Sequence, residues 1–237
     1  LKSPDMSIGF RVFTQRDLPP KDLVEKFKHI PAANIADGMN RSAAMASYIR
    51  LMTAPTECNM VGVALTVRAR GGDNLMFHKA LNMAEEGDVI VLSNEGDRSH
   101  ALMGEMMALY ARHKKVAGIV MEGPVRDVEA LYSLGVPVYA TGSTPGGPYK
   151  DGPGEVNVGI SCGGIFVCPG DIIVGDADGV IVVPKGLARQ CLEGGRRLLL
   201  NEEVKGPRLA DGTGDRSWVE KTLDQKGCET IDGIWLP

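Results

Sequence analysis

Aromatic residues are scarce in this chain, at 5% of 237 residues, whereas glycine is abundant, at 30 residues. A core with few aromatic rings has to be filled by aliphatic side chains, and frequent glycines permit tight turns between short elements. Hydrophobic residues still make up 43% and charged residues 24%, which is the mixture of a globular protein. The composition therefore excludes a disordered or fibrous chain. It favours one α/β domain, since single cores rarely grow beyond roughly 250 to 300 residues.

Long apolar runs and an excess of positive charge are also missing. Apolar stretches such as the one from Val180 to Val183 are far shorter than the ~20 residues that a membrane-spanning helix needs. The net charge of −4 and the pI near 5.6 offer no general attraction for a phosphate backbone. We therefore expect a protein that binds neither membranes nor nucleic acids.

The sequence contains no CxxC pair among its five cysteines, which are Cys58, Cys162, Cys168, Cys191 and Cys228. An odd number leaves at least one thiol unpaired in any disulfide scheme for a monomer. We therefore expect reduced thiols and a cytoplasmic location.

The hydrophobic pattern predicts alternating helices and strands as far as residue 140. In chain order we expect an arm over residues 1–20, a helix at 21–27, a helix from Ala33, a strand at 61–70, a helix at 73–86, a strand at 88–93, a helix at 104–115, a strand at 116–121, a helix at 128–134 and a strand at 138–140. This alternation is typical of a partly parallel sheet with covering helices.

The remainder of the chain begins with a segment rich in glycine and proline. Seven of its first eleven residues, from Thr144, are glycine or proline, so we expect a loop at 144–164. Short β-branched stretches at 164–167, 172–174 and 180–183 predict a strand meander, followed by a helix at 187–203, a polar linker at 206–214 and a final helix at 217–225. We divide the chain into an N-terminal arm with a short helix (1–30), a main domain (31–204) and a C-terminal segment (205–237).

An Arg-Asp pair, Arg126 and Asp127, follows the buried strand predicted at 116–121. Open α/β sheets place their ligand crevices at the carboxyl ends of such strands. Asp127 could instead cap the helix that follows, and Arg126 could form no more than a surface pair with it. On these two residues alone, the structural interpretation is the more frequent one.

Gly104 and Glu105 begin the preceding helix, with twenty residues between Glu105 and Arg126. A helix, a connection and a strand return the chain to the same sheet edge, so Glu105 and Asp127 can face one crevice. Free amides at the helix start suit a carboxylate, and two acidic side chains would attract Mg²⁺, which commonly uses one or two carboxylates. Glu105 could equally do no more than complement the helix dipole.

The segments around these motifs resemble the class II pyruvate aldolases of the 4-hydroxy-4-methyl-2-oxoglutarate and 4-carboxy-4-hydroxy-2-oxoadipate type. These enzymes share their fold with the regulator of ribonuclease activity A. The likeness covers nearly all of residues 30–190 and rests on several motifs in order. These are Gly72-Asp73-Asn74-Leu75 with His78, Gly87-Asp88-Val89, Gly104-Glu105, Arg126-Asp127, GPYKDGPGEVNVGISCGG from Gly147 to Gly164, Pro169-Gly170-Asp171 and Asp178-Gly179-Val180. The resemblance implies a swivelling β/β/α fold with mixed sheets and covering helices, assembled as a homotrimer or homohexamer.

The resemblance also implies an activity, which is metal-dependent retro-aldol cleavage of a 4-hydroxy-4-substituted 2-oxo diacid. The products would be pyruvate and a second oxo acid, and oxaloacetate decarboxylation would be a secondary activity because it passes through the same pyruvate enolate. Asp127 would bind Mg²⁺ or Mn²⁺, and Arg126 would contact the keto oxygen of the substrate. The start of the preceding helix, at Gly104, Glu105, Met106 and Met107, would hold the substrate's carboxylate.

This chain departs from the family pattern at two acidic positions. The family has an aspartate where this chain has Glu105, which could act on the metal directly or through water. The family pattern often adds an acid three residues after the metal-binding aspartate, where this chain has Ala130 preceded by Glu129. We assign no role to Glu129.

The base that takes the C4 hydroxyl proton is not evident from the sequence. A metal-associated water is one candidate, while His78 and His100 are weaker ones because a lone histidine is more often structural. Lys150 and Arg98 could contact a distal carboxylate of the substrate. Asp73 and Asn74 favour a cap of their helix slightly over a substrate contact. Four further residues, Met103, Met106, Met107 and Tyr110, are most simply core residues on one helical face.

Two other classes stay open. A protein-binding regulator without catalysis could share the fold, because fold does not establish function. A methyltransferase would need a glycine-rich loop directly after a strand, whereas the glycines here precede the predicted meander. For the C-terminal segment, which contains Trp218 and Trp235, we expect packing on a neighbouring subunit.

Overall fold

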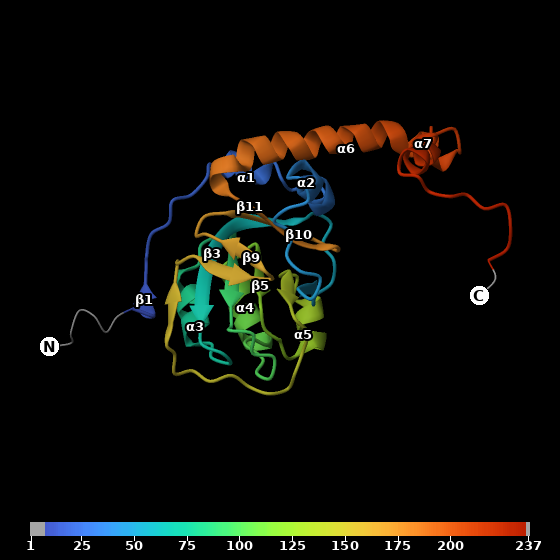
Figure 1. Ribbon diagram of the computed structural model, residues 1–237. Helices are drawn as coiled ribbons and strands as arrows, with labels where there is room; N and C mark the ends of the chain where they lie inside the picture. The colour runs from blue at the N-terminus through green and yellow to red at the C-terminus, as the bar shows by residue number, and fades with distance from the viewer. Residues whose placement is uncertain (1–7, 236–237) are drawn as a thin grey trace. The chain divides into compact units, whose positions relative to one another are not determined.

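The computed structural model describes residues 8–235, and the chain divides into two compact units, Leu1–Leu198 and Leu199–Pro237. The strands are β1 (Phe10–Val12), β2 (Arg50–Leu51), β3 (Met60–Ala69), β4 (Asp88–Ser93), β5 (Gly118–Met121), β6 (Val138–Ala140), β7 (Gly154–Val156), β8 (Ile160–Cys162), β9 (Ile165–Val167), β10 (Ile172–Asp176) and β11 (Gly179–Val183). The helices are α1 (Lys21–Glu25), α2 (Ala32–Gly38), α3 (Leu75–Met83), α4 (Glu105–His113), α5 (Val128–Ser133), the 3-10 helix η2 (Lys185–Leu187), α6 (Ala188–Ala210) and α7 (Trp218–Gln225) (Figure 1).

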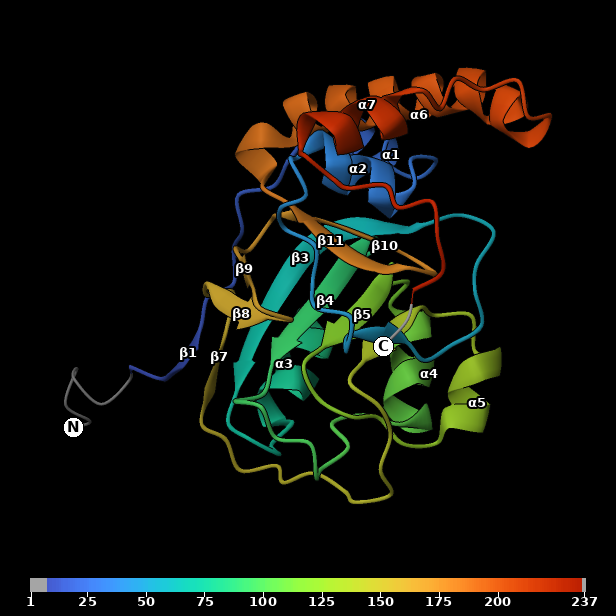
Figure 2. The ribbon, with the colours of Figure 1, turned by 45° about the vertical axis from the view of Figure 1, so that its right-hand side comes forward.

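A mixed sheet forms the centre of the first unit, and within residues 8–235 it contains nine strands. Its order is β1-β7-β3-β4-β5-β6-β2, with β10 paired to β3 and β11. Figure 2 shows β3, β4 and β5 side by side. The strands β3, β4, β5 and β6 run parallel to one another, as the alternation of helices and strands predicts. The mixed α/β architecture with covering helices is therefore confirmed, and the carboxyl ends of four parallel strands lie along one edge.

The loop predicted at 144–164 contains two strands, β7 and β8, so that prediction is wrong in part. The strand β7 pairs with the end of β3, where Gly154 lies opposite Ala69. A side chain at Gly154 would place its Cβ 2.5 Å from the carbonyl oxygen of Arg68, so this position requires the glycine that made the segment resemble a loop. The predicted meander is also wrong at its first step, because β9 pairs with β8 and not with β10.

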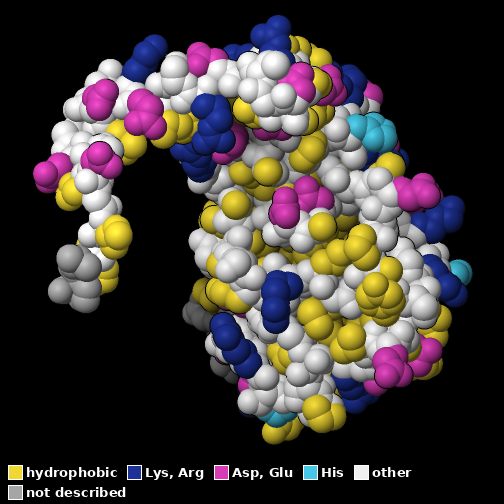
Figure 3. Space-filling model, turned by 90° about the vertical axis from the view of Figure 1, so that its right-hand side faces the viewer, with side chains coloured by type: hydrophobic (Ala, Val, Ile, Leu, Met, Phe, Trp, Pro, Cys, Tyr) yellow, Lys and Arg dark blue, Asp and Glu magenta, His cyan; other side chains and the backbone are white. Residues whose placement is uncertain are grey.

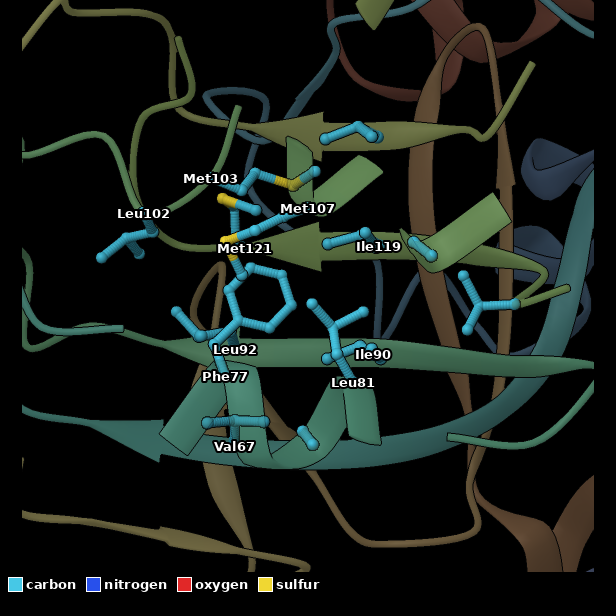
Figure 4. Packing of buried hydrophobic residues seen from close by; sticks show 14 of the residues in the cluster. Val67, Phe77, Leu81, Ile90, Leu92, Leu102, Met103, Met107, Ile119 and Met121 are labelled. Carbon is cyan, nitrogen blue, oxygen red and sulfur yellow. The ribbon is translucent and has the colours of Figure 1, made fainter. Parts of the chain in front are cut away.

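Alternate residues of the parallel strands fill two different layers, as the two-residue period of a strand requires. Leu65, Ile90, Leu92, Ile119 and Met121 face α3 and α4. Figure 4 shows Phe77 and Leu81 of α3, Leu102 and Met103 just before α4, and Met107 in its first turn, packed against Ile90, Leu92, Ile119 and Met121. Burying a side chain of this size stabilises the fold by about 1.5–3 kcal/mol. The start of α4 is therefore fixed by the core.

Two of the predicted core residues near α4 are exposed. Met106 and Tyr110 are 76% and 42% exposed, whereas Met103 and Met107 are buried. Met106 and Tyr110 are four residues apart and share the outer face of the helix, while Met107 lies about 100° around it. The prediction holds for Met103 and Met107 and is wrong for Met106 and Tyr110.

The other sheet face and one sheet end carry further apolar layers. The β8–β9 hairpin packs Ile160, Cys162 and Val167 against buried residues such as Val91 and Val120. The helices α1, α2 and the start of α6 cover β10 and β11 with a third apolar cluster. All five cysteines lie among the described residues and none is disulfide-bonded.

The second unit begins inside α6, which continues through Pro207 to Ala210. The linker predicted at 206–214 is therefore helical over its first part. No side chain from residue 199 to residue 235 is buried.

None of the helices between residues 8 and 235 combines the length and apolar character that crossing a bilayer requires. On the face in Figure 3, Lys and Arg side chains are interspersed with Asp and Glu.

Candidate active site

A pocket of about 360 Å³ lies at the carboxyl edge of the parallel strands. Its lining comes from the segments that follow β3, β4, β5 and β6, which is the place where open α/β sheets bind ligands. The lining residues are Asn74, His78, Ala101, Leu102, Met103, Gly104, Met106, Met107, Arg126, Asp127, Gly147, Pro148 and Lys150. The sheet therefore brings together the segments that the sequence motifs occupy.

Backbone hydrogen bonds tie these segments to one another beyond the ends of the strands. The amide of Arg126 donates to the carbonyl of Met103 at 2.9 Å, and the amide of Leu102 donates to the carbonyl of Pro124 at 2.9 Å. On the other side, the amide of Asn74 donates to the carbonyl of Tyr149 at 3.0 Å. The pocket walls are thus held by the same kind of pairing as the sheet, which fixes the backbone of these segments.

Asp127 precedes α5 in a left-handed backbone conformation, with φ 58° and ψ 42°. Such a conformation is uncommon for a residue other than glycine and is found where the surrounding structure enforces it, often at functional sites. The side chain makes no capping bond to α5. Its Oδ2 instead accepts a hydrogen bond from the backbone amide of Glu105 at 3.0 Å. The structure therefore contradicts the alternative in which Asp127 caps the following helix.

Gly104 makes room for this carboxylate. A Cβ at position 104 would lie 2.2 Å from Oδ2 of Asp127 and 2.9 Å from Cγ of Arg126, distances that non-bonded atoms cannot adopt without displacement. The absence of a side chain thus lets the carboxylate rest against the first turn of α4. The Asp127 side chain is still 44% exposed, so it can reach a ligand in the pocket.

Arg126 extends beside the carboxylate toward the glycine- and proline-rich loop. Its Nε lies 3.8 Å from Oδ2 of Asp127, and the side chain is 47% exposed. A Cβ at Gly147 would lie 3.3 Å from Nη1 of Arg126. A second hollow of about 360 Å³ borders Arg126 and Asp127 on the side of Val128 and Ser143. A permanently charged guanidinium with this exposure can bind an anionic oxygen.

The start of α4 offers two free backbone donors. The amide of Glu105 is engaged by Asp127, while the amides of Met106 and Met107 have no acceptor among residues 8–235. Both residues line the pocket. The Glu105 side chain is exposed and is not part of the lining, so the residue meets Asp127 through its backbone. Unpaired amides at a helix start attract a carboxylate.

Asn74 and His78 line the pocket from the start of α3. Asn74 makes no side-chain cap, so the favoured interpretation of this residue is wrong. Its Nδ2 donates to the carbonyl of Leu102 at 2.8 Å, and its buried Oδ1 has no partner among the described residues. Burial lowers the pKa of His78, and the nearby charge of Lys150 lowers it further.

Asp73, rather than Asn74, caps the start of α3. Its Oδ1 accepts from the amide of Leu75 at 2.9 Å. Its Oδ2 accepts from the amides of Asp151 at 2.6 Å and Gly152 at 2.9 Å. Asp73 is only 1% exposed. One buried carboxylate thereby anchors both the helix and the loop that carries Lys150.

His100 and Arg98 are not among the residues that line this pocket. The Nδ1 of His100 lies 3.1 Å from both carboxylate oxygens of Asp97, and its ring contacts that of Tyr149 at a centroid distance of 5.0 Å. The guanidinium of Arg98 lies 5.2 Å from the ring centroid of Tyr48. Both side chains have structural partners of their own.

The donor set fits a hard divalent cation that keeps most of its water. Within the described residues no group of three or more His, Cys, Asp or Glu residues could hold a metal, and Asp127 is the carboxylate in the pocket lining. Mg²⁺ is commonly bound through one or two carboxylates with several waters retained. The Asp127 carboxylate, 44% exposed and facing the pocket, suits such binding.

Comparisons with known proteins show which family the chain resembles in sequence and fold. A Halalkalibacterium halodurans protein with the provisional name 4-hydroxy-4-methyl-2-oxoglutarate aldolase is 36% identical over 203 residues, which cover 85% of this chain and 96% of that protein. Streptomyces coelicolor RraAS2, described as an unusual member of the RNase ES inhibitor RraA protein family, has a TM-score of 0.71 at 26% identity, covering 80% of this chain and 98% of the other.

A third similar structure is that of the RNA-processing inhibitor RraA from Thermus thermophilis. Its TM-score is 0.60 at 28% identity, over 65% of this chain and 92% of that one. The family model described as RraA-like, Aldolase/RraA, matches residues 32–182. This range contains every residue that lines the pocket. The chain therefore belongs to the RraA-like family.

Proposed function

We propose that this protein is a divalent-metal-dependent lyase that cleaves a 4-hydroxy-4-substituted 2-oxo diacid into pyruvate and a second oxo acid. The observation that carries the proposal is the position of the Asp127 carboxylate, which rests on the first turn of α4 through the gap at Gly104, with Arg126 beside it. A carboxylate that could hold a metal, the Arg126 guanidinium and two free amides lie around one pocket, and each suits one part of a 2-oxo acid.

The proposed roles follow the charges of the substrate. The free amides of Met106 and Met107 bind the substrate's C1 carboxylate. Asp127 would hold Mg²⁺ or Mn²⁺, which when bound supplies Lewis-acid polarisation of the 2-oxo group. Arg126 stabilises the negative charge that grows on the keto oxygen. Glu105, exposed on the first turn of α4, would contribute a second negative charge near the cation or its waters.

The reaction balances within the substrate. The C4 hydroxyl loses its proton, C4 becomes a carbonyl carbon, and the electron pair of the C3–C4 bond passes into the pyruvate enolate. A proton then adds to C3 and gives pyruvate. Loss of carbon dioxide from oxaloacetate sends an electron pair to the same atoms, so we propose oxaloacetate decarboxylation as a secondary activity.

The direct test is pyruvate release from 4-hydroxy-4-methyl-2-oxoglutarate, from 4-carboxy-4-hydroxy-2-oxoadipate and from oxaloacetate. Each is assayed with the metal-free protein and after addition of Mg²⁺ or Mn²⁺. Because divalent cations alone decarboxylate oxaloacetate, each rate is compared with a protein-free control. We expect release above that control only with metal, and faster release from the hydroxy diacids than from oxaloacetate. Absence of metal-dependent pyruvate from all three substrates contradicts the proposal.

A second candidate function is inhibition of an RNA-processing enzyme through protein binding. It is favoured by the similar structures from Streptomyces coelicolor and Thermus thermophilis, whose descriptions name inhibitors. Such a protein needs no turnover, so the same assay separates the two functions. A binding regulator would show no pyruvate release that depends on added metal.

A further inference from the structure

Another pocket, of about 290 Å³, lies beside the N-terminal arm, and we call it the arm pocket. Thr14, Arg16, Leu65, Met83, Glu85 and Asn157 are among the residues that line it. Met83 is the last residue of α3, whose start lines the candidate active site. The two linings have no residue in common. The arm pocket is therefore a separate site at the other end of α3.

The oxygen Oδ1 of Asn157 is buried and has no hydrogen-bond partner within residues 8–235. Asn157 as a whole is 8% exposed. Its Nδ2 donates to the carbonyl of Phe13 at 2.8 Å, which fixes which end of the amide is the oxygen. Buried polar atoms are nearly always paired, and an unpaired one calls for an explanation. Because an amide oxygen only accepts, the group that would satisfy it in the arm pocket is a hydrogen-bond donor.

The charges in the lining leave one carboxylate without a partner. Both terminal nitrogens of Arg16 donate to the carboxylate of Asp88 at 2.8 Å, and these two side chains are 8% and 3% exposed. The charge of Arg16 is therefore compensated within the fold. Glu85 is exposed and forms no ion pair with any described residue. A ligand in the arm pocket thus meets an acceptor at Asn157 and a free negative charge at Glu85.

The apolar part of the lining suits a short aliphatic group. Leu65 is 1% exposed and belongs to the core cluster that α3 covers, and Met83 packs against the same cluster. Leu18 of the arm also lines the pocket and is largely exposed. An aliphatic chain that covers these side chains removes apolar surface from water, which favours binding.

We infer that the arm pocket binds a small organic ammonium ion with a short aliphatic body. An N–H of the ammonium donates to Oδ1 of Asn157, its charge pairs with the carboxylate of Glu85, and its aliphatic body lies against the apolar part of the lining. A neutral alcohol would supply a donor without the charge, and a quaternary ammonium would supply the charge without a donor. The inference goes beyond the proposed function, and it assigns no reaction to the bound ammonium.

Three probes with the same butyl chain separate these contributions. Butylammonium, n-butanol and butyltrimethylammonium are titrated into the isotope-labelled full-length protein, and the NMR shifts of the backbone amides of residues 85 and 157 measure binding. We expect saturable shifts with butylammonium. The dissociation constant should be about 2- to 10-fold larger for butyltrimethylammonium, which has no N–H to donate, and about 2- to 5-fold larger for n-butanol, which has no charge. Absence of saturable shifts with butylammonium, or equal affinity for either other probe, overturns the inference.

Substitutions then assign the two contributions to their residues. Glu85→Gln should weaken butylammonium binding by about 2- to 5-fold, the range of an exposed ion pair, and leave n-butanol binding unchanged. Glu86→Gln is the matched control, because Glu86 is an exposed neighbouring acid outside the lining. An unchanged affinity in Glu85→Gln, or an equal loss in Glu86→Gln, overturns the inference.

Asn157→Gly tests the acceptor, since glycine adopts the φ of 58° at this position without strain. The difference in affinity between butylammonium and butyltrimethylammonium should vanish in this variant. A difference that persists would come from the size of the trimethyl group, and it contradicts the role of Asn157. Glu85→Gln alters an exposed side chain, so the inference remains testable if Asn157→Gly does not fold.

Discussion

The backbone amide of Glu105 donates a hydrogen bond to Oδ2 of Asp127 at 3.0 Å. This contact joins the first turn of α4 to the residue before α5 across a gap of 22 positions in the sequence. It holds the carboxylate at the pocket although the backbone of Asp127 lies in the left-handed region. The geometry that we assign to metal binding thus depends on a backbone donor, a strained residue and the missing side chain of Gly104.

The substitution Gly104→Ala should displace the Asp127 carboxylate, because the new Cβ would lie 2.2 Å from Oδ2. We expect metal-dependent kcat/KM to fall by about 100-fold, the size of effect that a misplacement of about 1 Å produces. Pyruvate release under metal saturation measures it. Gly186→Ala is the control, since its Cβ would meet no atom within 4 Å. Equal activities of the two variants would argue against this role of Gly104.

Substitutions at Asp127 should separate stability from activity. Asp127→Gly should be more stable than Asp127→Ala by about 1 kcal/mol, since glycine adopts a φ of 58° without the Cβ strain that alanine keeps. Both variants should lose metal-dependent turnover. Urea unfolding monitored by circular dichroism gives the difference in free energy of unfolding. A glycine variant less stable than the alanine variant would show that the conformation is not strained.

The pKa of His78 should rise in Lys150→Met, because the charge of Lys150 is one of the two causes that lower it. It should stay below the ordinary value of 6.5, since burial, the larger cause, is unchanged. A lowered pKa in the folded state means that unfolding takes up a proton. His78 therefore makes the free energy of unfolding fall as the pH decreases from about 6.5 toward the folded pKa. NMR titration of the histidine ring protons measures the shift, and an unchanged or lower pKa would rule out an effect of the Lys150 charge on His78.

Removing residues 205–237 should lower the oligomeric mass by more than the mass of the removed residues, because fewer subunits would assemble. The second unit has no buried side chain among residues 199–235, and Trp218 and Trp235 are 62% and 83% exposed. Tryptophan side chains are enriched at protein interfaces, and we expect the partner here to be a neighbouring subunit of a homotrimer or homohexamer. Light scattering on the shortened and full-length chains checks this expectation. An unchanged number of subunits would mean that the segment does not hold the assembly together.

Local patterns in the sequence predict much of this fold. The strands β4 and β6 have the predicted bounds, 88–93 and 138–140, because short apolar stretches with turn residues at both ends determine such strands locally. The sequence does not predict the strand β7. Its Gly154 is required by a close approach to β3, which is distant in sequence. The same holds for the buried pair of Arg16 and Asp88, whose two hydrogen bonds of 2.8 Å join segments 72 residues apart.

The sequence likewise predicts some features of the candidate site and misses others. The spacing between Glu105 and Arg126 predicts one crevice, and the pocket that holds Gly104, Arg126 and Asp127 agrees with it. The sequence does not reveal that the Glu105 backbone, rather than its side chain, meets Asp127. It also does not reveal that Asn74 leaves the capping of α3 to Asp73. Both facts depend on side-chain directions, which only the packed loops determine.

The central claim is that Asp127 holds the metal that retro-aldol cleavage requires. The most direct measurement is pyruvate release from 4-hydroxy-4-methyl-2-oxoglutarate while metal-free protein is titrated with Mg²⁺ or Mn²⁺, for the wild type, for Asp127→Ala and for Glu129→Gln. Glu129 is an exposed acid two residues away, at the start of α5, and serves as the matched control. We predict saturable, metal-dependent release by the wild type and Glu129→Gln, and loss of that release in Asp127→Ala. Full metal-dependent activity of Asp127→Ala would contradict it.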